Sequence, residues 1–248
     1  MKQYEQFKRE CADEITIQGN DKALAHETRE WMNQANLLKY SYHFEWLGRP
    51  IIQYPQDILA MQQIIWEVKP DLIVETGIAH GGSLIFFASM LELVATCTGI
   101  EGEVLGVDID IRPHNRKAIE EHPMYKRISM IQGSSIAPEI IAQVKEKAIG
   151  KKRILVCLDS NHTHDHVLAE LEAYAPLTAV GSYCVVMDTV IEDMPEGFFP
   201  DRPWGRGNNP KTSVWEYLKS HSEFEVDKSI QNKIMITVAP DGYLKRVR

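Results

Sequence analysis

The sequence predicts an α/β protein with a doubly wound, mostly parallel sheet of the Rossmann-like type. Downstream of Pro70, short apolar runs alternate with segments of helical spacing. This alternation is typical of a parallel sheet with helices on both faces. The runs are also continuously apolar, as in ILVCL at 154–158, which is what a strand buried on both faces requires.

The order of elements follows from these runs. The predicted strands are 72–75, 104–108, 127–131, 153–158 and 183–187, and the predicted helices between them lie near 82–95, 113–121, 136–148 and 163–175. A further helix is expected near 211–220. Two β runs, at 223–229 and 233–247, then predict a hairpin at the sheet edge with an antiparallel last strand.

We expect a helical N-terminal extension over residues 1–56 and a Rossmann-like domain over 57–248. Helical spacing is clear at 22–40 and at 56–68, and an aromatic segment broken by Gly and Pro lies between them. That segment either packs against the main domain or shares in a substrate pocket. The Pro- and Gly-rich stretch 190–210 has the length and composition of a lid-like loop.

Composition limits the function classes. The chain has 248 residues, is 44% hydrophobic and carries a formal net charge of −8, which argues against nonspecific nucleic-acid binding because that depends on phosphate neutralisation. The four cysteines form no paired pattern, as expected in a reducing cytoplasm. The first residues lack the apolar core of a signal peptide, and no stretch approaches the ~20 apolar residues of a membrane span. We therefore expect a cytoplasmic protein without a transmembrane segment.

A glycine-rich turn follows the first strand of the predicted sheet, where open α/β sheets bind ligands. The stretch ETGIAHGGS spans residues 75–83. Its glycines allow a tight turn and close approach of a ligand, and the following helix offers free N–H groups to a carboxylate. The alternative to a ligand-binding role is that the glycines only allow a tight turn from strand to helix. The candidate ligand-binding residues here are Glu75, Gly77, Ala79, Gly81, Gly82 and Ser83.

Two nucleotide-like cofactors compete for this turn. A dinucleotide fingerprint reads G-x-G-x-x-G, but its second glycine is replaced here by Ala79, which hinders approach of a pyrophosphate. The pattern E-x-G-x-x-x-G-x-S is met in full, and it is the form seen in enzymes that bind S-adenosylmethionine. Asp108, at the next strand end, is placed to accept hydrogen bonds from ribose hydroxyls, and Gly133 and Ser134, at the third, to lie near an adenine edge.

Acidic residues end the fourth and fifth predicted strands. Asp159 and Asp188 should lie close together, because neighbouring parallel strands end at the same edge of the sheet. Two carboxylates that share a site repel each other unless a cation lies between them. Magnesium commonly takes one or two carboxylates and keeps water or substrate oxygens at its other positions. We expect Mg²⁺ here, with Asp159 also bordering the cofactor.

A histidine cluster follows Asp159. We expect His162 to act as a general base on an acceptor hydroxyl acidified by the cation, with a plain surface histidine as the alternative. His166 more readily packs or forms hydrogen bonds, and His164 is expected to face solvent. A zinc hydrolase of the H-x-H-x-D-H type is disfavoured because the sequence H-x-H-D-H is one residue short.

The stretch from Gly48 to Val190 resembles the cephalosporin hydroxylase / rhamnosyl O-methyltransferase family. The segments that carry the resemblance are GRPIIQYPQD, VETGIAHGGS, LDSNHTHDHVLAEL, and YAPL followed by GSYCVVMDT. The resemblance implies a class I methyltransferase fold, S-adenosylmethionine and magnesium, with a relation to macrocin-type sugar O-methyltransferases. It also implies the same cofactor loop, Asp108 as ribose contact, Asp159 and Asp188 as metal ligands, and a base at His162.

One departure bears on the metal. Members of the family usually have an acidic residue where this chain has Met187, and a thioether is a poor magnesium ligand. The expected function is methyl transfer to a hydroxyl of a sugar in a surface polysaccharide, glycolipid or secondary metabolite, by a homo-oligomer. Trp204 in the 190–210 loop could stack on the sugar. The alternative is a non-catalytic subunit that binds S-adenosylmethionine and serves an oxygenase or a glycan-assembly complex.

Overall fold

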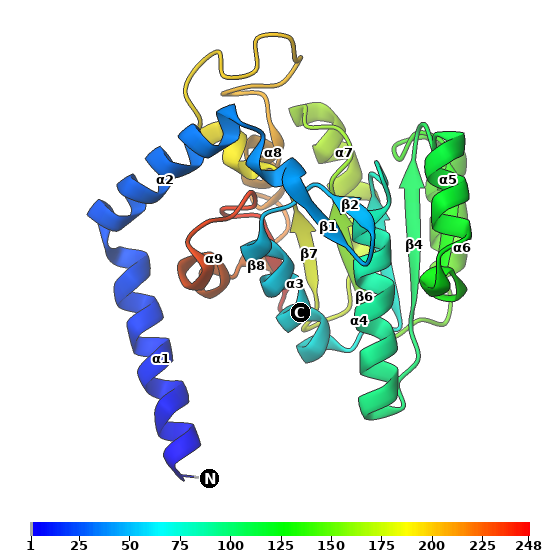
Figure 1. Ribbon diagram of the computed structural model, residues 1–248, viewed down its shortest axis with the longest axis horizontal. Coiled ribbons are helices and arrows are strands. Elements are labelled where there is room, and N and C mark those ends of the chain that lie inside the picture. The colour runs from blue at the N-terminus through cyan, green and yellow to red at the C-terminus, as the bar shows by residue number, and fades with distance from the viewer. Residues whose placement is uncertain (1) are drawn as a thin grey trace.

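The computed structural model describes residues 2–248, and its centre is a seven-stranded sheet (Figure 1). The strand order is β5-β4-β3-β6-β7-β9-β8. The strands are β3 (Leu72–Thr76), β4 (Glu103–Asp108), β5 (Ile128–Gln132), β6 (Ile154–Leu158), β7 (Tyr183–Val186), β8 (Phe224–Val226) and β9 (Tyr243–Arg246). The first five of these pair in parallel, whereas β9 is antiparallel to both β7 and β8. The predicted fold class is confirmed.

Helices cover both faces of the sheet (Figure 1). Apolar side chains of α3 (Pro55–Val68) and α4 (Gly82–Thr98), with Ile119 of α5 (Pro113–Glu120), form the core on one face. Those of α6 (Pro138–Ala148), α7 (His164–Tyr174) and α8 (Pro210–Tyr217) form the core on the other. Side chains along a strand alternate between the two cores: Ile73 faces the first, and Leu72 and Val74 face the second.

The strand order reverses between β3 and β6, and this reversal positions the site. The chain passes from β3 outward to β4 and β5, then returns to β6 on the other side of β3. Crossovers to opposite sides leave a crevice beyond the carboxyl ends of the two strands, where such sheets bind ligands. The register pairs Thr76 with Leu158, so the turn after β3 lies directly beside Asp159.

The C-terminal hairpin differs from the prediction. The predicted start of the last strand at residue 233 is wrong. Helix α9 occupies Lys228–Ile234, and β9 begins only at Tyr243. The buried Asp57 carboxylate of α3 accepts hydrogen bonds from the Val238 N–H (2.9 Å) and the Thr237 hydroxyl. The side chain of Asp57 thus takes a backbone donor that a strand ladder would have used. The β8–β9 pairing at the sheet edge is as expected.

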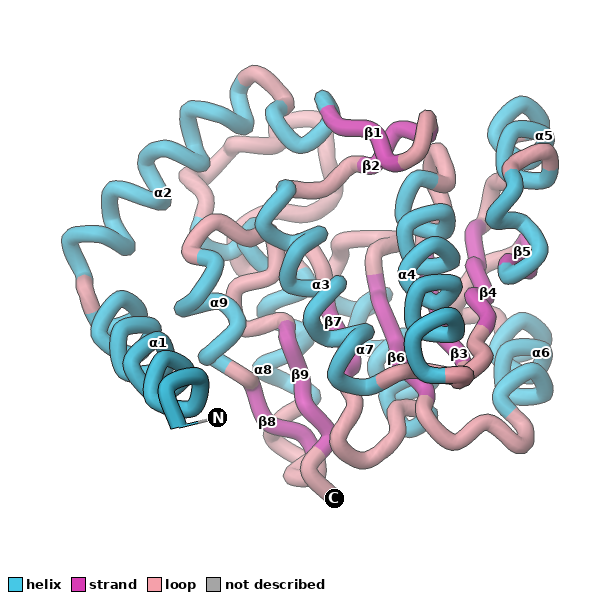
Figure 2. The backbone as a smooth tube through the Cα atoms, turned by 60° about the horizontal axis from the view of Figure 1, so that its bottom comes forward, coloured by secondary structure: helices cyan, strands magenta, loops and turns pink. Residues whose placement is uncertain are grey.

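The chain before α3 forms α1 (Lys2–Asn20), α2 (Lys22–Leu37), a 3₁₀ turn at Tyr40–His43, and a hairpin of β1 (Phe44–Trp46) and β2 (Arg49–Ile51). Figures 1 and 2 both show α1 and α2 to one side of the sheet. The hairpin instead packs on α4, where the Trp46 indole N–H donates to Ser89 (2.9 Å). No helix within residues 2–248 combines the length and the apolar character needed to cross a bilayer.

Candidate cofactor and metal site

The glycine turn leaves β3 and enters α4 beside the end of β6. Gly77 has φ +92°, and a Cβ at this position would lie 2.0 Å from the Asp159 carbonyl oxygen. Gly81 has φ +82° and is the N-cap of α4. The N-terminus of α4 packs closely against the β2 backbone. A Cβ on Gly82 would lie only 2.1 Å from the Pro50 carbonyl oxygen. Glycine is therefore required at Gly77 and Gly82 for space, in addition to any ligand.

Asp108 holds the turn from the end of β4. One carboxylate oxygen accepts hydrogen bonds from the backbone N–H groups of Ile78 (2.7 Å) and Ala79 (3.2 Å), and the other accepts from the Asp110 N–H (2.9 Å). Each carboxylate oxygen has more than one acceptor site, so these bonds leave capacity for a hydroxyl. A ribose contact at Asp108 stays a prediction, and the structure adds a role in shaping the turn.

Arg49 and Asn115 also hold this turn, and no local sequence pattern points to either of them. The Arg49 guanidinium donates to the His80 carbonyl (3.1 Å) and to the Asn115 side chain (3.1 Å). The Asn115 amide donates in turn to the Ala79 carbonyl (2.9 Å). Arg49 comes from β2 and Asn115 from α5, so only the tertiary fold brings them to the turn.

Glu75 is fully buried beneath the turn. One oxygen accepts from the Ser83 hydroxyl (2.9 Å), and the other has no hydrogen-bond partner within the part of the chain that the structure describes. Burial raises the pKa of Glu75 to about 8, because desolvation disfavours the carboxylate. A positively charged ligand beside it would stabilise the ionised form.

The pKa of Glu75 predicts a pH dependence of stability without ligand. Since the pKa is raised in the folded state, the folded protein retains this proton between about pH 4.5 and about pH 8, where the unfolded chain has lost it. Glu75 therefore costs the wild type up to about 1.4 kcal/mol of unfolding free energy per pH unit as pH rises through this window. Glu75→Gln should gain stability over the wild type from pH 5 to pH 8 in urea titrations. A constant difference across these pH values would contradict the assignment.

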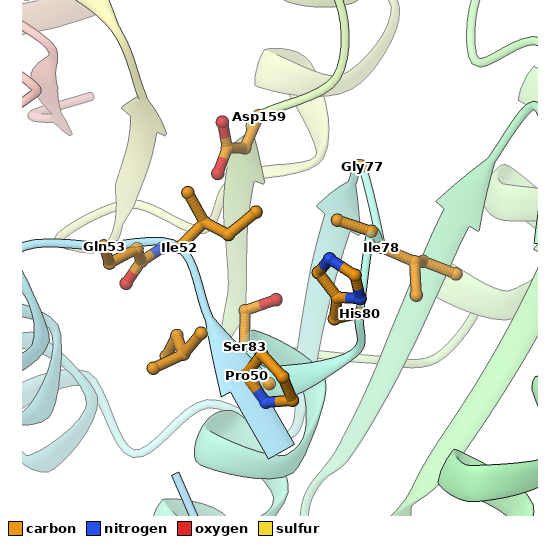
Figure 3. A pocket seen from close by; sticks show the side chains of 11 residues that line it. Pro50, Ile52, Gln53, Gly77, Ile78, His80, Ser83 and Asp159 are labelled. Atoms are coloured by element: carbon orange, nitrogen blue, oxygen red, sulfur yellow. The ribbon is translucent and has the colours of Figure 1, made fainter. Parts of the chain in front are cut away.

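A pocket opens between the glycine turn and the segment after β2. Figure 3 shows Pro50, Ile52 and Gln53 on one side, Gly77, Ile78 and His80 on the other, and Asp159 beyond them. Of the predicted cofactor residues, those that line this pocket are Gly77, Ala79, Gly82, Ser83 and Asp159.

The predicted adenine-side residues, Gly133 and Ser134, do not line this pocket, since they follow β5, two strands away from β3. Their predicted place near adenine stays a prediction.

Asp159, His162 and Asp188 come together at the ends of β6 and β7. One possible ligand atom from each residue lies within 4.8 Å of the others. The His162 Nε2 is 3.4 Å from an Asp188 carboxylate oxygen. Burial and the nearby Asp188 carboxylate raise the pKa of Asp159 well above its usual range. A cation among these groups would relieve both the desolvation and the repulsion, so the donor set fits a divalent metal.

The loop 190–210 reaches this cluster through Trp204. The Trp204 and His162 ring centroids are 4.8 Å apart in an edge-to-face arrangement. The loop base is fixed to Glu192, whose carboxylate accepts from the Gly207 N–H (2.7 Å). Trp204 therefore packs on the candidate base, a contact that the sequence did not predict.

The other histidines point to different partners. His164 is half-buried, contrary to the expected solvent-facing position, and its Nδ1 is 2.8 Å from the Thr212 hydroxyl. His166 Nε2 is 3.0 Å from the Ser135 hydroxyl. Among residues 2–248, the only group of three or more possible metal-ligating side chains is Asp159, His162 and Asp188. A zinc centre built from the three histidines has no geometric support.

Met187 is 1% exposed and belongs to the apolar core on the α4 face. A thioether in the core neither binds nor obstructs a cation. Among the described residues, the candidate metal ligands are therefore the carboxylates of Asp159 and Asp188, with His162 beside them and free positions left for water or an acceptor oxygen.

The antiparallel β9 and the glycine turn at the strand-order reversal are typical of class I S-adenosylmethionine-dependent methyltransferases. The model of the family described as Rhamnosyl O-methyltransferase/CmcI matches residues 38–247. The chain belongs to this family and is an O-methyltransferase.

Individual relatives agree with this membership. Rhamnosyl O-methyltransferase of Mycobacterium bovis is 32% identical over 233 residues, covering 90% of this chain and 85% of the relative. The Mycobacterium leprae protein of the same name is 30% identical over 203 residues, which cover 81% of this chain and 82% of the relative. A CmcI structure in an Mg-SAM form has a TM-score of 0.56 at 20% identity, covering 84% of this chain and 78% of the other. This last likeness shows the shared fold.

Proposed function

We propose that this protein transfers a methyl group from S-adenosylmethionine to a hydroxyl of a sugar, with Mg²⁺ held by Asp159 and Asp188. The observation that carries the proposal is the cluster of Asp159, His162 and Asp188 beside the glycine turn. It joins a cation-binding donor set and a proton acceptor to the cofactor pocket, since Asp159 belongs to both. The names of the Mycobacterium relatives favour a rhamnosyl unit as the acceptor.

Each residue has a distinct task in this proposal. Bound Mg²⁺ would lower the pKa of an acceptor hydroxyl. His162 then removes the hydroxyl proton, while Asp188, 3.4 Å from its Nε2, orients the ring and stabilises the imidazolium. The glycine turn and Glu75 hold the cofactor, and correct positioning of methyl group and oxygen supplies much of the rate enhancement. Trp204 packs edge-to-face on the His162 ring and shields one side of it from water.

Metal binding by this cluster is directly testable without turnover. We expect Asp188→Asn to weaken Mg²⁺ binding in calorimetry by about tenfold or more, because a neutral amide replaces one of two anionic ligands. Asp165→Asn is the matched control, since Asp165 is an exposed carboxylate on the neighbouring helix α7. Equal Mg²⁺ affinity in wild type and Asp188→Asn would place the cation elsewhere.

The acceptor class requires a transfer assay. Methyl-labelled S-adenosylmethionine should label glycans or glycolipids that carry a free rhamnosyl hydroxyl, and labelling should fall when Mg²⁺ is chelated. Transfer to phenolic acceptors but to no sugar would contradict the proposed substrate class.

A further inference from the structure

Gln53 is a buried amide without a partner. The residue is 2% exposed, and within the described chain neither its side-chain nitrogen nor its oxygen forms a hydrogen bond. Burying an amide without partners costs free energy of order 1–3 kcal/mol. A leucine of similar volume would fill the same space without that cost. The unsatisfied amide therefore indicates that something else supplies its partners.

The position of Gln53 indicates what that partner is. Gln53 lies two residues after β2 and lines the same pocket as Ser83 and Asp159 (Figure 3). The β2 backbone touches the start of α4 at Gly82, which fixes this segment over the helix N-terminus. The free N–H groups of a helix N-terminus favour a carboxylate.

A second unpartnered group lies beneath the same turn. Glu75 leaves one carboxylate oxygen without a hydrogen bond, and its other oxygen is bound to Ser83, which lines the pocket. An amide offers two N–H donors and a carbonyl acceptor, whereas a carboxylate offers only acceptors. The Gln53 amide can therefore donate to a carboxylate and accept from an ammonium group of one ligand, and Glu75, which does not itself line the pocket, adds a carboxyl group beneath the same turn.

We propose that Gln53 binds the amino-acid end of S-adenosylmethionine, its amide N–H donating to the cofactor carboxylate and its carbonyl accepting from the ammonium group. This inference rests on the proposed function, since it requires cofactor in this pocket. With this contact, the segment after β2, which precedes the seven-stranded sheet in the chain, becomes part of the cofactor site. The adenosyl part then extends toward Asp108 at the end of β4.

The test compares two ligands that differ in this end alone. S-adenosylhomocysteine carries the amino-acid group, and 5′-methylthioadenosine lacks it. We expect Gln53→Leu to raise the calorimetric Kd for S-adenosylhomocysteine about tenfold or more, which is about 1.4 kcal/mol. The Kd for 5′-methylthioadenosine should change less than about twofold. Melting of the ligand-free variant should occur at or above the wild-type temperature, because an unpaired amide has been removed.

Gln56→Leu is the matched control. Gln56 is the second residue of α3, and its side-chain oxygen is also buried without a partner among the described residues, but the residue does not line the pocket. It should bind S-adenosylhomocysteine as the wild type does. Gln53→Glu provides a second variant of nearly equal shape. It keeps an acceptor for the ammonium group but loses the N–H donor and places a negative charge beside the cofactor carboxylate, so S-adenosylhomocysteine binding should weaken.

The outcomes separate this inference from the function on which it rests. Unchanged S-adenosylhomocysteine affinity in both Gln53 variants overturns the inference, as does an equal loss for both ligands, which indicates a structural role. Failure of the wild type to bind S-adenosylhomocysteine overturns the proposed function instead.

Discussion

Replacement of His162 by alanine is expected to lower kcat about 10²-fold or more, because the variant loses the proposed general base. The affinity for S-adenosylhomocysteine should stay near the wild-type value, since His162 does not line the candidate cofactor pocket. Steady-state methyl transfer and calorimetry on the same preparation measure the two quantities. The combination of slow turnover and intact cofactor binding identifies a residue that acts on the acceptor.

His164→Ala is the matched control for this experiment. His164 lies two residues further along the chain and is also half-buried, but its ring contacts Thr212 of α8. We expect its kcat to stay within a few-fold of the wild-type value. A wild-type rate in His162→Ala would remove this histidine from the mechanism, and an equal loss in both variants would indicate disturbed packing.

Gly77→Ala is expected to destabilise the protein by about 2–5 kcal/mol and to weaken S-adenosylhomocysteine binding more than about 100-fold. The left-handed backbone at φ +92° disfavours any Cβ by roughly 1–2 kcal/mol. The new methyl group would also lie 2.0 Å from the Asp159 backbone oxygen, which cannot move without shifting the Asp159 side chain in the candidate metal site. Urea unfolding and calorimetry measure the two effects.

Gly150→Ala separates backbone strain from collision. Gly150 has φ +81°, but a Cβ there would meet no atom of the described residues within 4 Å. Its unfolding free energy should fall by about 1–2 kcal/mol, with cofactor affinity unchanged. If Gly77→Ala costs no more than Gly150→Ala and still binds cofactor, the close packing of the turn on Asp159 does not limit this site.

The sequence alone predicts those parts of the candidate site whose side chains directly follow a strand. Asp159 and Asp188 end neighbouring parallel strands, and their proximity follows from the strand order alone. The hydrophobic pattern does not reveal Arg49 and Asn115, which hold the turn, or Gln53, whose unpaired amide is visible only as a buried group. The run at 233–238 has the local pattern of a strand, but α9 takes up its start and the buried Asp57 carboxylate accepts from the Val238 backbone N–H.

The doubly wound sheet, the glycine turn and the acidic strand ends can all be recognised from the sequence, because alternating apolar runs and turn residues are patterns of neighbouring residues. The tertiary structure decided which distant segments close the site: the β2 segment over α4, Trp204 on His162, and Met187 in the core. These contacts depend on side-chain packing between elements far apart in sequence, which no local pattern encodes.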